Sequence, residues 1–162
     1  MPVESKRDPT TEIAALTPGT VFHGTYEVIR CIKAGGMGAV YEVLQQSTRR
    51  HRALKVMLPS IVSDPEMRDR FKLEATVAAD IDSEHIVETL DAGVDAETGL
   101  PFIVMELLKG QELSALIREV GPIAPGEVAS MLLQIARALD KTHARGIVHR
   151  DLKPANLFLE RR

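Results

Sequence analysis

The sequence predicts an α+β protein in which a small antiparallel sheet with one helix is followed by a helical segment. Runs rich in β-branched and aromatic residues, separated by glycine or polar turns, occupy the first two thirds of the chain and indicate strands. Between residues 127 and 143 the apolar residues instead recur every three or four positions, which indicates a helix. With 162 residues, the chain is long enough for one domain or two small lobes.

The composition is that of an ordinary folded protein, with 44% hydrophobic residues and a net charge of -3. This charge gives no sign of a nucleic-acid partner or of binding to an anionic membrane. No apolar run approaches the roughly 20 residues of a membrane span. The single cysteine, Cys31, excludes an intrachain disulfide, and its apolar strand pattern predicts a buried thiol. We therefore expect a cytoplasmic protein, with no membrane segment in this chain.

The chain begins with residues 1–18, whose mixture of polar, charged and proline residues predicts a flexible leader. Tyr26 to Ile32 and Ala39 to Leu44 are predicted strands, joined by a turn at Gly35-Gly36-Met37-Gly38. An ordinary hairpin explains this pattern. The functional alternative is a loop whose small residues let backbone N–H groups approach nucleotide phosphates. The ordinary hairpin is the stronger interpretation, because a glycine-rich turn alone is a weak signal.

A third strand is predicted from His51 to Leu58, with Lys55 interrupting its apolar end. A helix is expected to start near residues 63–66, where Ser63 or Asp64 can cap it and a proline suits its first turn, and to run to about residue 80. Its inward side would carry Met67, Phe71, Val77 and Ala78. The same stripe contains an acid, Glu74, which either finds a partner or keeps its carboxylate in water.

Two further strands are predicted from His85 to Leu90 and from Phe102 to Leu108, with turn-rich residues 91–101 between them. The five strands and the helix would form a first lobe, residues 19–108. Residues 109–162 would form a second, helical part, in which the helix at 127–143 has one broad apolar face. That face would carry Val128, Met131, Leu132, Ile135 and Leu139.

A ten-residue stretch, Ile147 to Asn156, carries the strongest functional signal in the chain. It places an acid (Asp151), a cation (Lys153) and a carboxamide (Asn156) close together, between apolar runs that would fix both ends in a core. Transfer of a phosphoryl group to a hydroxyl needs a carboxylate to orient the hydroxyl, a cation near the phosphate and an oxygen ligand for magnesium. A charged surface loop is the alternative for any single residue, but it explains the whole string poorly.

His149-Arg150-Asp151-Leu152 with Asn156 resembles the catalytic loop of eukaryotic-type serine/threonine protein kinases, and Lys153-Pro154 is similar to the serine/threonine branch. Gly-Gly-Met-Gly-x-Val-Tyr at residues 35–41 resembles bacterial members of this family. The resemblance implies a protein-kinase-like fold: a five-stranded N-lobe with one regulatory helix, followed by the first helices and catalytic loop of a C-lobe.

The resemblance also implies ATP and Mg²⁺ as cofactors, a protein Ser or Thr hydroxyl as substrate, and a role for each matching residue. Asp151 would orient and deprotonate the hydroxyl, Lys153 would neutralise the phosphoryl group, and Asn156 would bind magnesium. Lys55, paired with Glu74, would hold the nucleotide phosphates. The remaining nucleotide-binding positions would be Gly35, Gly36, Gly38, Val40, Ala53, Met105, Glu106, Leu108 and Glu112. The first glycine of the family's loop is replaced here by Lys33, which keeps the strand extended.

The sequence contains no Asp-Phe-Gly, whose Asp ordinarily binds magnesium, and no Ala-Pro-Glu after the catalytic loop. We therefore expect a truncated kinase domain with little or no transfer activity alone, and possible self-association through the apolar helix face. A non-catalytic ATP-binding or protein-interaction module is the alternative function. An interrupted gene is a third explanation of the same sequence.

Overall fold

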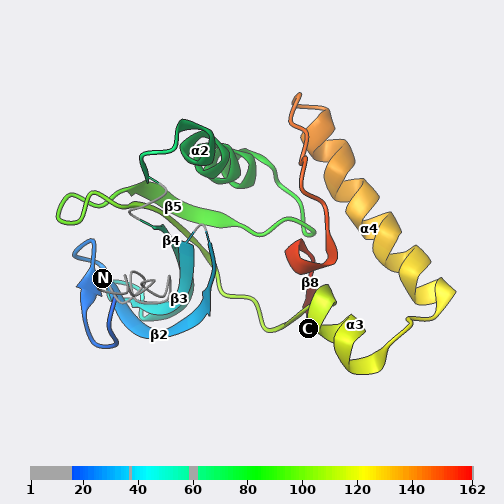
Figure 1. Cartoon of the computed structure of the whole chain (residues 1–162), viewed down its shortest axis with the longest axis horizontal. Helices are drawn as coiled ribbons and strands as arrows, with labels where there is room; N and C mark the ends of the chain where they lie inside the picture. The colour runs from blue at the N-terminus through cyan, green and yellow to red at the C-terminus, as the bar shows by residue number, and fades with distance from the viewer. Residues whose placement is uncertain (1–15, 37, 59–61, 162) are drawn as a thin grey trace, which may run out of the picture. The chain divides into compact units, whose positions relative to one another are not determined.

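The computed structural model describes residues 16–36, 38–58 and 62–161 (Figure 1). The side chains of Arg70, Glu74 and residues 76–80 lie outside this description, as do most of the predicted leader and Met37 of the glycine turn. The expected inward positions of Val77 and Ala78 therefore also lie outside it. The chain forms two compact units, one from the described part of Met1–Thr76 with Glu88–Leu107, and the other from Val77–Val87 with the described part of Leu108–Arg162.

The first unit is built on a six-stranded antiparallel sheet, which Figure 1 shows as strongly curved. The strands lie in the order β1-β2-β3-β4-β6-β5. Their bounds are Val21–Phe22, Tyr26–Ala34, Gly38–Gln45, Arg50–Met57, Pro101–Glu106 and Thr89–Val94, respectively. The predicted antiparallel lobe is thus confirmed, with the two-residue β1 added at one edge.

Alternation along the strands separates two faces of this sheet, because successive side chains point to opposite sides. In β3, Ala39, Tyr41 and Val43 are buried, while the residues between them are only half-buried. The buried face forms the main core of the unit. Its members are Phe22, Tyr26, Val28, Ala39, Tyr41, Val43, Leu54, Val56, Leu100, Phe102 and Val104. On the other face, Met57 of β4 and Ile103 of β6 pack with Phe71.

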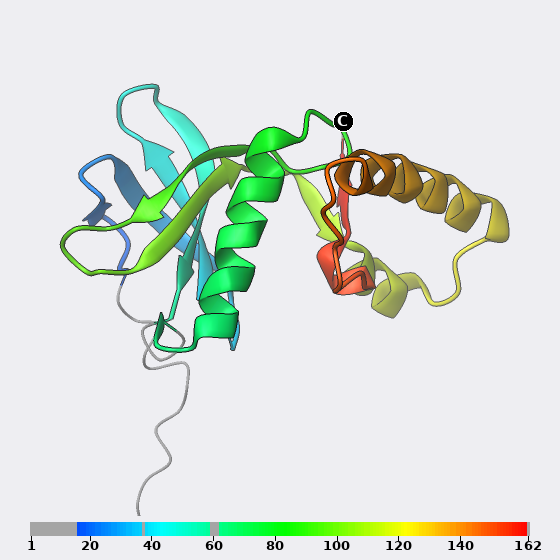
Figure 2. The same ribbon diagram turned by 90° about the horizontal axis from the view of Figure 1, so that it is seen from above.

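Helix α2 runs from Pro65 to Asp80 and begins where the sequence predicts. The Asp64 carboxylate accepts hydrogen bonds from the backbone N–H groups of Glu66 and Met67 at 2.9 and 3.3 Å, which caps the helix as expected. Figure 2 shows α2, in green, running alongside the sheet. Phe71 anchors it, since this ring is buried and packs with Met57 and Ile103.

The strand predicted at residues 85–90 is wrong in position. Residues 83–86 form a turn in which the Ile86 N–H donates to the Ser83 carbonyl at 3.1 Å, residues 87–88 are irregular, and β5 begins only at Thr89. The strand continues through residues 91–94, which the sequence assigns to a turn, because β5 is an edge strand whose backbone pairs with β6 while its side chains stay largely exposed. Polar and glycine residues are tolerated there, so the composition does not reveal the strand.

The prediction that Cys31 is buried is also wrong: this cysteine is exposed. Strand β2 has two register irregularities, between Val28 and Arg30 and between Cys31 and Lys33. Each bulge interrupts the alternation of side chains between the two faces. From Arg30 onward, the described side chains of β2 no longer reach the core.

The second unit contains helix α3 (Leu113–Val120), helix α4 (Pro125–His143), a short 3-10 helix η2 (Pro154–Asn156) and a two-stranded sheet. The helix predicted at 127–143 is confirmed as α4. Several large apolar side chains of α4 are exposed: Val128, Leu132 and Leu133 at 38, 58 and 54%. None of the helices in the described residues is long and apolar enough to span a membrane.

The two-stranded sheet pairs β7 (Gly110–Glu112) with β8 (Phe158–Glu160), and the sequence does not predict it. Gly110 has a φ of 150°, and a side chain there would collide with the Leu159 carbonyl oxygen. Apolar burial was expected to fix both ends of the 147–156 stretch, but Val148 and Phe158 are exposed. The pairing of β8 with β7 holds the C-terminal end of this stretch instead.

Candidate active site

The glycine turn between β2 and β3 contains glycines with different structural requirements. The Gly35 N–H donates to the Gly38 carbonyl at 2.9 Å, which closes the turn. A side chain at Gly38 would collide with the Val56 carbonyl oxygen of β4, so the packing of the strands itself requires a glycine there. At Gly36 an added Cβ would meet no described atom within 4 Å, and at Gly35 only one at 4.0 Å. Strand packing therefore explains the glycine at position 38 but not Gly35 and Gly36, where the approach of a ligand would explain the absence of a side chain.

Four of the predicted nucleotide-binding side chains lie on one face of the sheet in the first unit. Val40 is the cross-strand partner of Lys55, and Ala53 is the partner of Met105. Ala53 and Lys55 are two residues apart in β4, so their side chains share a face. This face is the one opposite the main core, since Leu54 between them is fully buried in that core. The structure thus assembles an apolar surface with one cation at its end.

Lys55 is also close to helix α2. Its Nζ lies over the ring of Phe71, 5.9 Å from the ring centroid. The predicted pairing of Lys55 with Glu74 involves a side chain outside the described residues and stays a prediction. From the sequence, Phe71 is assigned to the core alone. Phe71 and Glu74 are three residues apart and therefore lie on one side of the helix, which was the available signal that Phe71 is close to the predicted Lys55–Glu74 pair.

The backbone of Glu106, at the end of β6, is already partly used. Its N–H donates to the Glu88 carbonyl at 3.1 Å, and its carboxylate accepts from the Glu88 N–H at 2.9 Å. Glu106 would therefore have only its carbonyl oxygen to present to an adenine. Leu108 and Glu112 belong to the second unit, where Glu112 precedes α3 and its carboxylate accepts a 3.1 Å hydrogen bond from the Ser114 hydroxyl.

Asp151, Lys153 and Asn156 converge within the second unit. Lys153 Nζ lies 2.9 Å from Asp151 Oδ2. The Asn156 amide nitrogen donates to the Asp151 main-chain carbonyl at 2.8 Å and to Asp151 Oδ2 at 3.1 Å. The structure thus joins the three predicted catalytic and magnesium-binding residues around one carboxylate that is 59% exposed.

These contacts keep the Asp151 carboxylate ionised. The hydrogen bond from Lys153 is the largest cause that lowers the pKa of Asp151 below its ordinary value, followed by the hydrogen bond from Asn156. Such an oxygen attracts hydroxyl donors and cations strongly. It is a weak proton acceptor, because its basicity falls with its pKa.

The backbone around Asp151 is sharply bent. Arg150 has a φ of 60°, a left-handed conformation that costs a non-glycine residue about 1–2 kcal/mol. This conformation brings the Asp151 N–H within hydrogen-bonding distance of the His149 carbonyl (2.9 Å) and ring Nδ1 (3.3 Å). His149 therefore anchors the loop, and its ring points to the backbone of Asp151.

Backbone hydrogen bonds hold the far end of this loop. The Asn156 N–H donates to the Lys153 carbonyl at 2.9 Å within η2, and the Leu113 N–H at the start of α3 donates to the Leu157 carbonyl at 2.8 Å. The β7 and β8 pairing follows immediately. Asn156 is thus fixed by main-chain contacts on both sides, which directs its amide toward Asp151.

A bound magnesium would need few ligands from this chain. Across residues 16–36, 38–58 and 62–161, no group of three or more His, Cys, Asp or Glu side chains is placed to hold a metal ion. Magnesium commonly takes one or two protein oxygens and completes its shell with nucleotide phosphates and water. The oxygens of Asn156 and Asp151 fit this mode, because both belong to hard ligands on an exposed loop.

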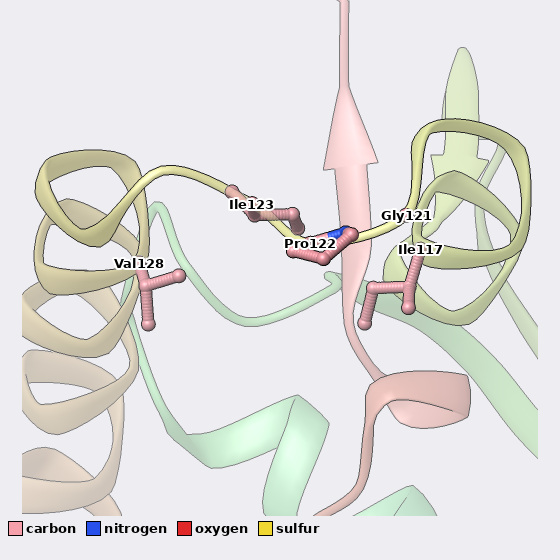
Figure 3. Close-up of a pocket in the computed structure, with 5 residues that line it drawn as sticks. All are labelled: Ile117, Gly121, Pro122, Ile123 and Val128. Atoms are coloured by element: carbon pink, nitrogen blue, oxygen red, sulfur yellow. The ribbon is translucent and has the colours of Figure 1, made fainter.

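The second unit also has an open apolar hollow at the connection between α3 and α4 (Figure 3). It is lined by Ile117, Gly121, Pro122, Ile123 and Val128. None of these side chains can donate to or accept from a phosphate, or transfer a proton. The hollow is therefore not a candidate for the phosphoryl chemistry.

Comparisons with known proteins give a consistent result. The family described as "Protein kinase domain" matches residues 26–162. The serine/threonine-protein kinase PknE of Mycobacterium bovis is 39% identical over 142 residues, and Pkn1 of Myxococcus xanthus is 43% identical over 139 residues. These alignments cover 87% and 86% of this chain but only 24% and 20% of the relatives. The chain thus spans about a quarter or less of their length.

Solved structures agree with this result. The crystal structure of the Mycobacterium tuberculosis PknI kinase domain superposes with a TM-score of 0.78 at 36% identity, covering 90% of this chain and 59% of that structure. The predicted kinase-like α+β fold is confirmed by this similarity.

Proposed function

Because the chain belongs to the protein kinase family, we propose that its residues form the ATP–magnesium site and the catalytic loop for transfer of the γ-phosphoryl group to a Ser or Thr hydroxyl of a protein. Since the sequence contains no Asp-Phe-Gly, we expect this transfer to be slow in the 162-residue chain alone. The convergence of Lys153 and Asn156 on the Asp151 carboxylate supports this proposal most directly. The relatives named as serine/threonine-protein kinases support the choice of hydroxyl. The single cysteine is compatible with the cytoplasmic location that the proposal includes.

Asp151 would act mainly by orientation. Its carboxylate is ionised and exposed, so it accepts a hydrogen bond from the substrate hydroxyl and points the oxygen at the phosphorus. Phosphoryl transfer passes through a loose transition state in which the nucleophile carries little negative charge, so a weak base suffices. Proton transfer to Asp151 then completes late in the reaction.

Lys153 and Asn156 would serve the phosphoryl group and the metal. The Lys153 ammonium, held beside Asp151 at 2.9 Å, would shift toward the transferred phosphoryl oxygens and neutralise their charge. Asn156 donates to Asp151 through its amide nitrogen, so its carbonyl oxygen is the atom of this side chain that would hold magnesium. When bound, magnesium would supply positive charge that offsets the negative charge of the phosphates.

The first unit would hold the nucleotide. Val40, Ala53 and Met105 offer the apolar face for adenine, and Lys55 offers the cation for the phosphates. Gly35 and Gly36, which no described neighbour crowds, would let backbone N–H groups reach the phosphates.

A non-catalytic nucleotide-binding module is the second candidate function. The observation that favours it is Lys33, which occupies the position of the family's first glycine and continues strand β2 in register with Val40. An extended strand at this point leaves a shorter flexible turn for the phosphates. The chain would then bind ATP without turning it over.

A transfer assay separates the two functions. The 162-residue chain is incubated with Mg-ATP and a mixture of Ser- and Thr-containing peptides, and phosphopeptides are counted by mass spectrometry beside the Asp151→Asn variant. Kinase function requires transfer that Asp151→Asn lowers by about 10²–10⁴-fold without weakening ATP binding. ATP binding with no transfer in either protein would support the module instead. Transfer that is equal in both would contradict the role of Asp151.

A further inference from the structure

Phe71 is placed to control the Lys55 side chain. The Lys55 Nζ lies over the Phe71 ring, 5.9 Å from its centroid, and the ring itself is only 8% exposed. Phe71 packs with Met57 and Ile103. These two residues are also neighbours of Lys55: Met57 lies two positions along β4, and Ile103 is the cross-strand partner of Lys55 in β6. Strands β4 and β6, which carry Lys55 and its cross-strand partner, therefore also hold the Phe71 ring beside the lysine.

This arrangement has a physical consequence for a flexible side chain. The face of a phenyl ring carries negative charge density and attracts a cation within about 6 Å of its centroid. A lysine stem has four freely rotating carbons, so its ammonium samples many positions unless a fixed group selects among them. The Phe71 ring is such a fixed group, because burial between Met57 and Ile103 leaves it little freedom.

We propose that Phe71 is a positioning residue that holds the Lys55 ammonium where a nucleotide phosphate can bind it. This inference rests on the proposed function, in which Lys55 binds the phosphates. Phe71 itself contacts no nucleotide in this account and acts only through Lys55. Its aromatic character, and not only its apolar volume, is what the role requires.

The test uses Phe71→Leu, which keeps an apolar side chain and removes the ring, in the full 162-residue chain. Phe22→Leu is the matched control, because Phe22 is also a buried ring of the same unit, in the main core cluster, at 3% exposure against 8% for Phe71. In the protein without nucleotide, NMR should show the Lys55 ε-methylene protons displaced upfield by the Phe71 ring. This displacement should be lost in Phe71→Leu and retained in Phe22→Leu.

Nucleotide binding supplies the second measurement. Phe71→Leu should weaken Mg-ATP by about two- to fivefold while leaving the affinity for adenosine, which lacks phosphates, unchanged. In a Lys55→Met background, Phe71→Leu should cause no further loss of affinity for ATP. Phe22→Leu should change the affinities for ATP and adenosine by equal factors, if it changes them at all.

The outcomes distinguish this inference from the proposed function. A wild-type protein that binds no ATP would contradict the proposed function and, with it, the phosphate role of the pair. If ATP binds, an absent upfield displacement, or equal losses of ATP and adenosine affinity in Phe71→Leu, would overturn the positioning role alone. Loss of the displacement together with a selective loss of ATP affinity would support it.

Discussion

The amide nitrogen of Asn156 donates two hydrogen bonds to Asp151, one to the main-chain carbonyl at 2.8 Å and one to carboxylate Oδ2 at 3.1 Å. The same Oδ2 contacts Lys153 Nζ at 2.9 Å. Oδ2 of Asp151 therefore contacts both the Asn156 amide and the Lys153 ammonium. This pairing orients the carboxylate plane, and it makes the charge state of Asp151 depend on two identifiable neighbours.

The first prediction concerns that charge state. Lys153→Met should raise the pKa of Asp151 toward its ordinary value of 3.8, and Asn156→Leu should raise it by less, because the hydrogen bond from Lys153 is the larger cause of the lowered pKa. Titration of the carboxyl carbon by NMR measures both changes. Lys141→Met, which removes an exposed lysine on α4, is the control and should leave the Asp151 titration unchanged. A larger rise in the Asp151 pKa in Asn156→Leu than in Lys153→Met would contradict this ranking of the two hydrogen bonds.

The second prediction separates the glycines of the turn. Gly38→Ala should lower the free energy of unfolding by about 1–3 kcal/mol, because its Cβ would collide with the Val56 carbonyl oxygen and force the strands apart. Gly36→Ala meets no described atom and should change stability by less than about 0.5 kcal/mol, while weakening Mg-ATP if phosphates approach the turn. Urea denaturation and calorimetry measure the two effects. Equal destabilisation by both substitutions would show that the conformation of the turn, and not the contact with β4, requires glycine at position 38.

The third prediction concerns a buried acid in the turn between β5 and β6. Asp95 is 3% exposed, and its carboxylate accepts hydrogen bonds from the Thr98 N–H and hydroxyl at 2.8 and 2.7 Å and lies 3.1 Å from His23 Nδ1. Burial raises the pKa of Asp95, but the bonds from Thr98 and the contact with His23 outweigh it and leave the pKa below its ordinary value of 3.8. Asp95→Asn should therefore cost about 1–3 kcal/mol at neutral pH.

The pH dependence follows from the direction of that shift. A carboxyl with a lowered folded-state pKa stabilises the fold fully above its unfolded pKa, and this contribution is lost as the pH falls from about 3.8 through the lower folded value. Thermal unfolding between pH 7 and pH 2 should thus show a smaller acid-induced loss in Asp95→Asn than in the wild type. Glu97→Gln, which alters an exposed acid of the same turn, should keep the wild-type pH profile. An unchanged profile in Asp95→Asn would exclude this carboxyl as a source of the acid sensitivity.

The fourth prediction concerns the apolar face of α4. Leu132 and Leu133 are 58 and 54% exposed, and large exposed apolar side chains favour association. We expect the chain to self-associate with rising concentration, and Leu132→Glu with Leu133→Glu to reduce this association. Gln134→Glu adds a charge at an exposed polar position of the same helix and should have little effect. Sedimentation velocity measures all three proteins, and a wild type that stays monomeric throughout would contradict the prediction.

The sequence predicted the fold well wherever periodicity and capping agree. The Asp64 cap and the buried Phe71 define α2, and the regular apolar spacing defines α4. It failed where pairing, not side-chain burial, defines a strand, as in β5 and in the three-residue β7 and β8. It also failed at Cys31, because a bulge that reverses the faces of a strand has no compositional mark.

The candidate site was predictable in its residue types and only partly in its geometry. Motif spacing identified Asp151, Lys153 and Asn156, and the structure brings these three together. The contact of Lys55 with Phe71 depends on how α2 packs on β4 and β6, so the spacing of Phe71 from Glu74 indicated a shared side of the helix and not the contact itself. The catalytic and binding roles of these residues stay predictions until binding and transfer are measured.

The measurement that tests the central claim most directly is magnesium-dependent ATP binding by calorimetry, comparing the wild type with Lys55→Ala. Lys72→Ala is the matched control, because it removes an exposed lysine of α2 in the same unit. The account predicts one-to-one binding that requires magnesium, is weakened at least tenfold by Lys55→Ala and is unchanged by Lys72→Ala. ATP binding that is equal in all three proteins, or absent from the folded wild type, would contradict the claim that this sheet face and Lys55 form a nucleotide site.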